Sequence, residues 1–254
     1  MTTPQQDKPA VVCVFCGSVA GNDPAHLESA RALARAFHEN NVQLVYGGGT
    51  VGMMGELART LVKLSGPQAV HGVIPRALVK VEEGYKNAEE FDPAAATEAA
   101  QQQQQSGGVA GKAPERVLPD PMDKTTMIKE SEYGVVTIVP DMHTRKRLMA
   151  TKVLEGGPGS GFVALAGGFG TMEEVMEMTT WNQLGIHKVG VVLVNIKGYW
   201  DGLLAWVRNA VKEGYLSEAN AKILVEAKDV SEVLPKLREY KVSDGRLQLN
   251  WGQE

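Results

Sequence analysis

The stretch from residue 162 to residue 181, FVALAGGFGTMEEVMEMTTW, constrains the fold of this chain more than any other. It opens with a short apolar run, residues 162–166, which is typical of a strand buried on both faces of a parallel sheet. Gly167, Gly168 and Gly170 interrupt this run, and a helical pattern follows. The stretch therefore predicts a strand, a glycine-rich turn and a helix in direct succession.

The start of this helix is predicted from a capping box. Thr171 is followed three residues later by Glu174, the spacing at which the two residues satisfy each other's backbone groups, so we expect the helix to begin at Thr171. Glycines let a ligand approach the backbone, and the free N–H groups and positive dipole end of a helix N-terminus favour an anion. The sequence thus predicts a phosphate site here.

Strands and helices alternate along the rest of the chain. This alternation predicts one α/β domain, a doubly wound, Rossmann-like and mostly parallel sheet flanked by helices. The expected strands are 11–15, 42–46, 70–74, 135–139, 162–166 and 189–195, with a last edge strand at 222–225 or 227–230. The expected helices include 26–39, 53–64, one ending at 154, 198–213, 217–223 and 231–240, with a short one at 123–130.

Two more glycine-bearing turns follow predicted strands. Gly17 and Ser18 come after the first strand, and Gly48 and Gly49 lie in the turn after the second. In a doubly wound sheet the ligand binds beyond the carboxyl ends of the strands. We therefore expect all three turns to gather at one edge and to contribute to one binding site.

The composition changes between about residues 85 and 114, where alanine, glutamine and glycine dominate and a pure glutamine run occupies 101–105. Such a segment lacks the apolar periodicity needed to bury a face, so it is interpreted as a disordered insertion. A tolerated loop expansion is favoured over a partner-binding role. The domain is expected to span 11–240, between a disordered tail at 1–10 and a frayed tail at 241–254.

Composition excludes some classes of function. The 254 residues are 43% hydrophobic and carry a formal charge of −4, which provides no global field to recruit nucleic acid. No apolar run is long enough for a membrane span or a leader, so a cytoplasmic protein is expected.

Cys13 and Cys16 have CxxC spacing but no second Cys/His cluster, and strand alternation directs them to opposite faces. We interpret them as reduced core cysteines. The five histidines are scattered, so we expect neither a metal nor a cofactor.

Two pairs of charged residues could take part in chemistry. Arg145 and Lys146 lie at a strand-to-helix junction, where an arginine fork suits a phosphate or a ribose diol. Glu173 and Glu174 follow the central turn. Each pair alone has an ordinary explanation, a solvated basic surface for the first and a helix cap or dipole complement for the second. Glu173 is the more natural dipole complement of the two acids.

Taken together, these motifs resemble those of the Lonely Guy (LOG) family of cytokinin riboside 5'-monophosphate phosphoribohydrolases. The resemblance is carried by GGFGTMEE, the upstream MHTRK, the FCGS and YGGGTVGMMG turns, GVIP and the stretch TWNQLGIHKVG. It covers nearly the whole chain except the insertion and the two ends. Ala166 replaces the family's proline. The substrate-contacting acidic residue that the family places before the 135–139 strand has no clear match here, and Glu130 and Glu132 both lie near its position.

The resemblance implies hydrolysis of the N-glycosidic bond of a nucleoside 5'-monophosphate, either AMP or an N6-modified AMP. It implies Arg145 and Glu174 as catalytic residues. It implies substrate contacts from Lys146, Thr180, the central turn and Thr171. It also implies a homodimer, with helices around Met149 and Met176 at its interface.

Alternative functions remain open from sequence alone. The family is also labelled lysine decarboxylase, which would need a lysine that holds pyridoxal phosphate, and no lysine is singled out for that role. A general purine monophosphate nucleosidase and a non-catalytic nucleotide-binding module are the other hypotheses. The presence of both Arg145 and Glu174 favours an enzyme.

Overall fold

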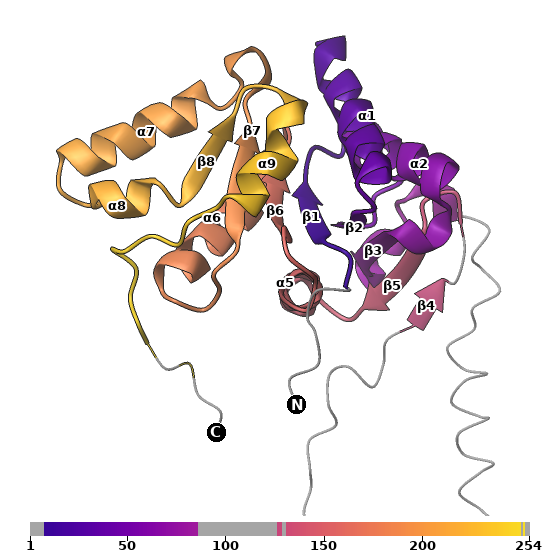
Figure 1. Ribbon diagram of the computed structural model, residues 1–254. Coiled ribbons are helices and arrows are strands. Elements are labelled where there is room, and N and C mark those ends of the chain that lie inside the picture. Colours follow the sequence, from indigo (N-terminus) through magenta and orange to yellow (C-terminus); the bar gives the residue numbers. More distant parts are fainter. Residues whose placement is uncertain (1–7, 86–125, 129–130, 250, 252–254) are drawn as a thin grey trace, which may run out of the picture.

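The computed structural model describes residues 8–85, 126–128, 131–249 and 251, and these form one α/β domain around a single sheet (Figure 1). The strands are β1 (Val11–Phe15), β2 (Gln43–Tyr46), β3 (Val70–Pro75), β4 (Thr126–Ile128), β5 (Val135–Val139), β6 (Gly161–Ala164), β7 (Gly190–Val194) and β8 (Leu224–Ala227). The helices are α1 (Pro24–Glu39), α2 (Gly52–Ser65), α3 (Arg76–Val79), α5 (Met142–Leu154), α6 (Phe169–Gln183), α7 (Asp201–Lys212), α8 (Glu218–Ala221) and α9 (Val233–Arg238).

The sheet has the order β4-β5-β3-β2-β1-β6-β7-β8, and only β4 is antiparallel to its neighbour. The chain winds outward from β1 through β2, β3 and β5, and then returns to place β6 on the other side of β1. The predicted doubly wound fold is confirmed. Its switch point lies at β1 and β6, and such a point opens a crevice at the carboxyl ends of these strands.

Helices cover both faces of the sheet because the parallel strands are apolar on both sides. α1, α2 and α9 pack on one face through Leu33, Leu57 and Leu234. α5, α6 and α7 pack on the other, where Met149 and Val175 belong to the second core cluster. In Figure 1, α1 and α2 lie together on one side of the strands, and α5 and α6 lie on the other. None of the described helices is long and apolar enough to cross a membrane.

The two cysteines are buried and free, as predicted. Cys13 belongs to the α5 side of the core and Cys16 to the α1 side, which is the alternation expected of a strand. Burial raises the pKa of both thiols, so neither is held as a reactive thiolate.

Several expectations from the sequence need correction. The segment expected to form a helix at 123–130 contains strand β4, whose residues pair with β5 at the sheet edge. Thr126 and Ile128 are β-branched, and edge pairing favours such residues over a short helix. Tyr85, placed at the start of the insertion, is buried and donates a 2.7 Å hydrogen bond from its hydroxyl to the Gly48 carbonyl. Residues 8–10, expected to belong to the disordered N-terminal tail, are ordered: the Pro9 and Ala10 carbonyls each accept a 2.9 Å hydrogen bond, from the N–H groups of Gly157 and Gln43. Residues 86–114 of the insertion and 1–7 of the N-terminal tail lie outside the described residues.

The C-terminal segment, expected to be frayed, is instead anchored over its described part. The Arg246 guanidinium donates to the carbonyls of Gly185 and His187, at 3.0 and 3.2 Å. The Leu247 N–H donates to the Gln183 carbonyl at 2.8 Å, and the Trp251 indole donates to Leu184 at 2.9 Å. The segment therefore satisfies carbonyls at the end of α6 that the helix leaves free.

Candidate functional site

The candidate site is a cleft of about 400 Å³ beyond the carboxyl ends of the central strands. Three glycine-bearing turns meet there, as the sequence predicts. The turn after β1 contributes Gly17 and Ser18, the turn after β2 contributes Gly47 and Gly49, and the start of α6 contributes residues 168–171. These turns come from sequence positions far apart and form one wall only because β1, β2 and β6 are neighbours.

The turns pack directly against one another. The Gly17 N–H donates to the Ala166 carbonyl at 2.9 Å, which joins the first turn to the end of the central strand. Gly52 has a φ of +60°, and a Cβ there would overlap the backbone of Ser18 and Val19. Glycine is thus required at residue 52 both by conformation and by the close approach of the two turns.

The helix after the central turn begins earlier than the capping box predicts. α6 starts at Phe169 with Gly168 as its N-cap, and no side chain caps it. Thr171 is buried in the first turn, where its side chain fills the space that a Cβ at Gly167 would occupy. The capping-box prediction is therefore wrong, because Thr171 packs against the turn while Glu174 is engaged elsewhere.

This helix start has the features of an anion site. The first intrahelical bond is donated by Met172 to the Gly168 carbonyl, so the backbone N–H groups of residues 169–171 have no helical partner. A Cβ placed on Gly168 or Gly170 would meet nothing within 4 Å, so both glycines face open space. Free N–H groups at the positive end of a helix dipole, beside open space, fit a phosphate group.

Arg145 and Glu174 form the charged centre of the cleft. Arg145 Nη2 lies 3.2 Å from Glu174 Oε1, and the two side chains are 11% and 9% exposed. Arg145 comes from the first turn of α5, and its guanidinium lies against Gly47, where any Cβ would overlap it. The pair is close but incompletely bonded. Within the described part of the chain, Arg145 Nε and Glu174 Oε1 are buried with no hydrogen-bond partner.

Burial changes the acidity of Glu174. Desolvation raises its pKa to about 7, the Arg145 charge opposes this rise, and the Glu173 carboxylate adds to it. A carboxyl group that titrates near neutral pH in a cleft is a common feature of catalytic sites. It is suited to hold or to release a proton during a reaction at physiological pH.

The predicted site residues divide into two groups. Nine of them line the cleft: Gly17, Ser18, Gly49, Arg145, Gly168, Gly170, Thr171, Glu173 and Glu174. The other four are placed differently. The Gly48 and Gly167 carbonyls accept hydrogen bonds from the hydroxyls of Tyr85 and Tyr199, which supports the turns from behind. Thr180 is exposed on α6, and neither Thr180 nor Lys146 is part of the cleft lining.

Lys146 is held by acidic side chains of α6 instead. Its ammonium forms an ion pair with Glu173 and a second one, at 3.0 Å, with Glu177 Oε2. Glu173 and Glu177 flank Glu174 on the same helix, and the Lys146 charge counters their effect on its pKa. In this structure Lys146 therefore acts on the cleft through its electrostatic field rather than by lining it.

The sequence reasoning missed Glu82, which also lines the cleft. Its Oε2 accepts 2.8 Å hydrogen bonds from both the backbone N–H and the hydroxyl of Thr50. Glu132, one of the two acids considered from the resemblance, is exposed and absent from the lining, and Glu130 lies outside the described residues. Glu82 follows α3 in a loop with no periodicity, so only its charge after the β3 segment could have drawn attention to it.

Apolar side chains form the rest of the cleft. Met54, Ile74, Leu78 and Met142 belong to its lining, from α2, β3, α3 and α5. Phe169 stands at the rim with 97% of its surface exposed. The cleft thus combines a helix N-terminus for an anion, a buried charged pair and an apolar wall. Within the described residues, no cluster of three or more His, Cys, Asp or Glu side chains could hold a metal ion.

Comparison with known proteins identifies relatives of this chain. The family model described as "Possible lysine decarboxylase" matches residues 54–237. A bifunctional cytokinin biosynthesis protein from Fusarium pseudograminearum is 44% identical over 97% of this chain, but the match covers only 43% of that protein. This chain therefore spans less than half the length of the Fusarium relative.

Plant relatives match over most of their own length. A probable cytokinin riboside 5'-monophosphate phosphoribohydrolase, LOGL1, from Oryza sativa subsp. japonica is 36% identical, with 90% of this chain and 79% of that protein covered. The cytokinin riboside 5'-monophosphate phosphoribohydrolase LOG7 of Arabidopsis thaliana is 34% identical, with 91% and 82% covered.

Solved structures agree on the fold alone. The Moco carrier protein of Chlamydomonas reinhardtii superimposes with a TM-score of 0.52 at 14% identity, with 91% of this chain and 97% of that chain covered. The molybdenum cofactor binding protein of Rippkaea orientalis gives 0.51 at 13% identity, with 91% and 96% covered. The match to the family model and to the plant proteins is much more specific, and together they show that this chain belongs to the LOG family.

Proposed function

We propose that this chain hydrolyses the N-glycosidic bond of cytokinin riboside 5'-monophosphates and releases the free base and ribose 5-phosphate. The observation that supports this most directly is the buried Arg145–Glu174 pair beside the open N-terminus of α6. The plant relatives whose names carry this activity match over 90% of the chain or more.

The geometry suggests how substrate would be held. The 5'-phosphate would lie at the start of α6, where Gly168, Gly170 and Thr171 offer backbone N–H groups. Arg145 would hold the substrate from the α5 side. The apolar wall that includes Ile74 and Leu78 suits an adenine base with an apolar N6 substituent.

Glu174 is proposed as the catalytic carboxylate. As the glycosidic bond breaks, its electrons move to the base and the ribose becomes positively charged near C1', which a nearby carboxylate stabilises. A water molecule then adds its oxygen to C1'. The proton that the water loses is balanced by the proton that the departing base gains. Ionised Glu174 can accept the proton from water, and its pKa near 7 permits the transfer.

The lysine decarboxylase description of the family model is not supported by this cleft. Decarboxylation with pyridoxal phosphate requires a lysine in position to form a Schiff base. The described residues that line the cleft include no lysine, and the ammonium of the neighbouring Lys146 is engaged by two carboxylates.

We also propose a homodimer. Met176 is half-buried on α6 and Phe169 is exposed, so this face keeps apolar surface in the monomer. Met149, named with Met176 from the resemblance, is buried inside the protomer and is not available to a partner. Light scattering coupled to size-exclusion chromatography tests the dimer.

The activity is tested by measuring base release from AMP and from isopentenyladenosine 5'-monophosphate side by side. Release from the modified nucleotide that is lost in Glu174→Gln, and kept in the matched surface variant Glu39→Gln, is the expected result. Faster release from AMP would favour a general purine monophosphate nucleosidase. Nucleotide binding without release from either substrate would favour a binding module.

A further inference from the structure

A second cavity lies at the opposite edge of the sheet from the cleft. It has a volume of about 260 Å³ and opens where β1, β2 and β3 begin, against the last turn of α5. Its apolar floor comes from Val11 and Val45, which belong to the α5 side of the core. The cleft at the carboxyl edge shares none of the residues that line this cavity.

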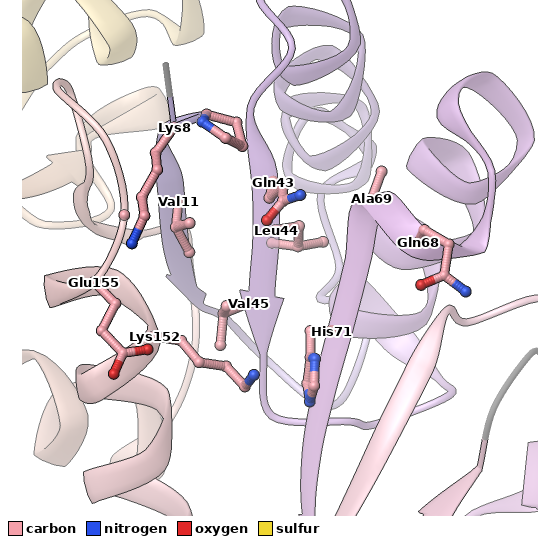
Figure 2. A pocket seen from close by; sticks show the side chains of 12 residues that line it. Lys8, Val11, Gln43, Leu44, Val45, Gln68, Ala69, His71, Lys152 and Glu155 are labelled. Atoms are coloured by element: carbon pink, nitrogen blue, oxygen red, sulfur yellow. The ribbon is translucent and has the colours of Figure 1, made fainter. Parts of the chain in front are cut away.

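Lysine and histidine side chains from three separate segments line this cavity. Lys152 comes from the last turn of α5, Lys8 from the segment before β1 and His71 from β3 (Figure 2). Figure 2 shows Lys152 extending from its helix toward His71, across Val45, and Lys8 extending toward the same helix. Among the described residues that line the cavity, Glu155 is the only acidic one.

Among the described residues, neither Lys152 nor Lys8 has a carboxylate oxygen within 4.0 Å of its ammonium. Burial lowers the pKa of Lys152, and the Glu155 carboxylate opposes this only in part. The negative end of α5 also favours a cation here. The pKa of Lys152 is lowered all the same. The Glu155 carboxylate and the end of α5 therefore do not fully compensate the Lys152 ammonium for its loss of solvent.

His71 contributes a neutral ring. Desolvation first, and then the Lys152 charge, lower its pKa to about 4. Its Nε2 lies 2.7 Å from the Thr137 hydroxyl, which fixes the ring against β5. Gln43 and Gln68 at the opening add neutral amide donors. The cavity therefore presents two cations, hydrogen-bonding groups and an apolar floor.

We propose that this cavity is a binding site for a small anionic metabolite with a phosphate or carboxylate group, held by Lys152 and Lys8. An anion would supply the counter-charge that a half-buried ammonium otherwise lacks. The volume is slightly below the range of roughly 300–1,000 Å³ typical of drug-sized ligands, so the ligand is small. The site does not depend on the function proposed for the cleft.

The site also has a structural link to the cleft. α5 carries Arg145 in its first turn and Lys152 in its last, so the two cavities share one helix. Seven residues along an α-helix span about 10 Å. A ligand on Lys152 therefore contacts the same rigid element that positions Arg145.

The test is lysine-specific NMR on the full chain after reductive ¹³C-methylation, which keeps the lysine charges. Lys152→Met assigns the Lys152 signal. Inorganic phosphate and succinate are titrated separately at constant ionic strength. The local readout separates this cavity from any phosphate that binds at α6.

The expected result is a saturable shift of the Lys152 and Lys8 signals, with no such shift for the exposed Lys212 of α7. The titration followed at Lys8 should weaken at least tenfold in Lys152→Met and stay unchanged in Lys212→Met. Saturation by phosphate alone would assign a phosphorylated ligand, and saturation by succinate alone a carboxylate. Linear shifts shared by Lys212, or a Lys8 titration unaffected by Lys152→Met, would overturn the proposal.

Discussion

Arg145 Nη2 and Glu174 Oε1 are 3.2 Å apart in a buried cleft, yet the Glu174 oxygen has no hydrogen bond among the described residues. The arginine neutralises the carboxylate without fully satisfying it. Burial therefore still dominates the acidity of Glu174 and raises its pKa to about 7. A group in this state responds to pH and to small changes in its surroundings, and the first predictions follow from that.

Activity should depend on the ionisation of Glu174. If its carboxylate is the active form, kcat/KM should rise with pH through about 7 and then level off. Glu174→Gln should remove most turnover and with it this pH dependence. The measurement is a pH–rate profile from pH 5 to 9 with AMP. A wild-type profile that is flat across pH 7 would contradict the assignment.

The contribution of Glu174 to the stability of the fold should fall as the pH rises, whereas activity should increase. The pKa of Glu174 is higher in the folded protein than the ordinary glutamate value, so its protonated form stabilises the fold at low pH. That contribution is lost as pH rises through about 7. Relative to wild type, Glu174→Gln should therefore have a more favourable Tm difference at pH 8 than at pH 5. Equal Tm differences at the two pH values would count against a raised pKa.

Lys146 should determine the pH at which activity rises. Its ammonium lies between Glu173 and Glu177, and Lys146→Met would leave both negative charges uncompensated beside Glu174. The pKa of Glu174 should then rise further, which moves the acid limb of the profile to higher pH. Lys63→Met, on the exposed side of α2, serves as the matched control. A lower rate with no movement of the limb would point to a direct substrate contact instead.

Gly47 should be intolerant of any side chain. A Cβ at this position would overlap the Arg145 guanidinium, so Gly47→Ala should displace it. A shift of about 1 Å at a catalytic group can cost roughly 100-fold in rate, and we expect a loss of this order in kcat/KM. Gly202→Ala, where a Cβ would meet nothing within 4 Å, is the control. Full activity in Gly47→Ala would separate Arg145 from the reaction.

The C-terminal segment should contribute to stability through Arg246. Its guanidinium donates to two carbonyls after α6. A hydrogen bond that involves a charged group contributes about 1.5–3 kcal/mol to the free energy of unfolding. Arg246→Ala should lower Tm by several degrees, whereas the exposed Arg208→Ala on α7 should not. Thermal unfolding followed by circular dichroism measures this. An unchanged Tm in Arg246→Ala would mean that the segment is held by its other contacts.

The sequence predicts the sheet well because strands buried on both faces produce short apolar runs with clear ends. It also predicts that the three glycine-bearing turns gather at one site, since the carboxyl ends of parallel strands share one edge. The joint role of Arg145 and Glu174 is implied only by the family resemblance. Prediction from the sequence fails where a tertiary contact overrides a local pattern. Glu174 fits a capping box in sequence, but it binds Arg145 from another helix.

Other features had no local signal at all. Glu82 enters the cleft from a loop, and its position depends on two hydrogen bonds to Thr50, more than thirty residues away. Strand β4 is only three residues long and exists through pairing with β5, so its β-branched residues are too few to form a strand pattern that can be recognised in the sequence. The C-terminal segment looks polar and free in sequence because its binding partners are the carbonyls after α6.

The start of α6 and Glu174 belong to one rigid helix, and this gives the site a fixed internal length. Residues 168 and 174 are separated by six residues of chain, or about 9 Å of helical rise. When the phosphate of a substrate is bound at the helix start, this fixed distance determines which atoms of the substrate lie beside the Glu174 carboxylate. Under the proposed function, a nucleoside without phosphate or a 3'-monophosphate can enter the cleft, but its C1' atom is not held beside Glu174. Selectivity for 5'-monophosphates therefore appears in the rate of bond cleavage rather than in binding alone.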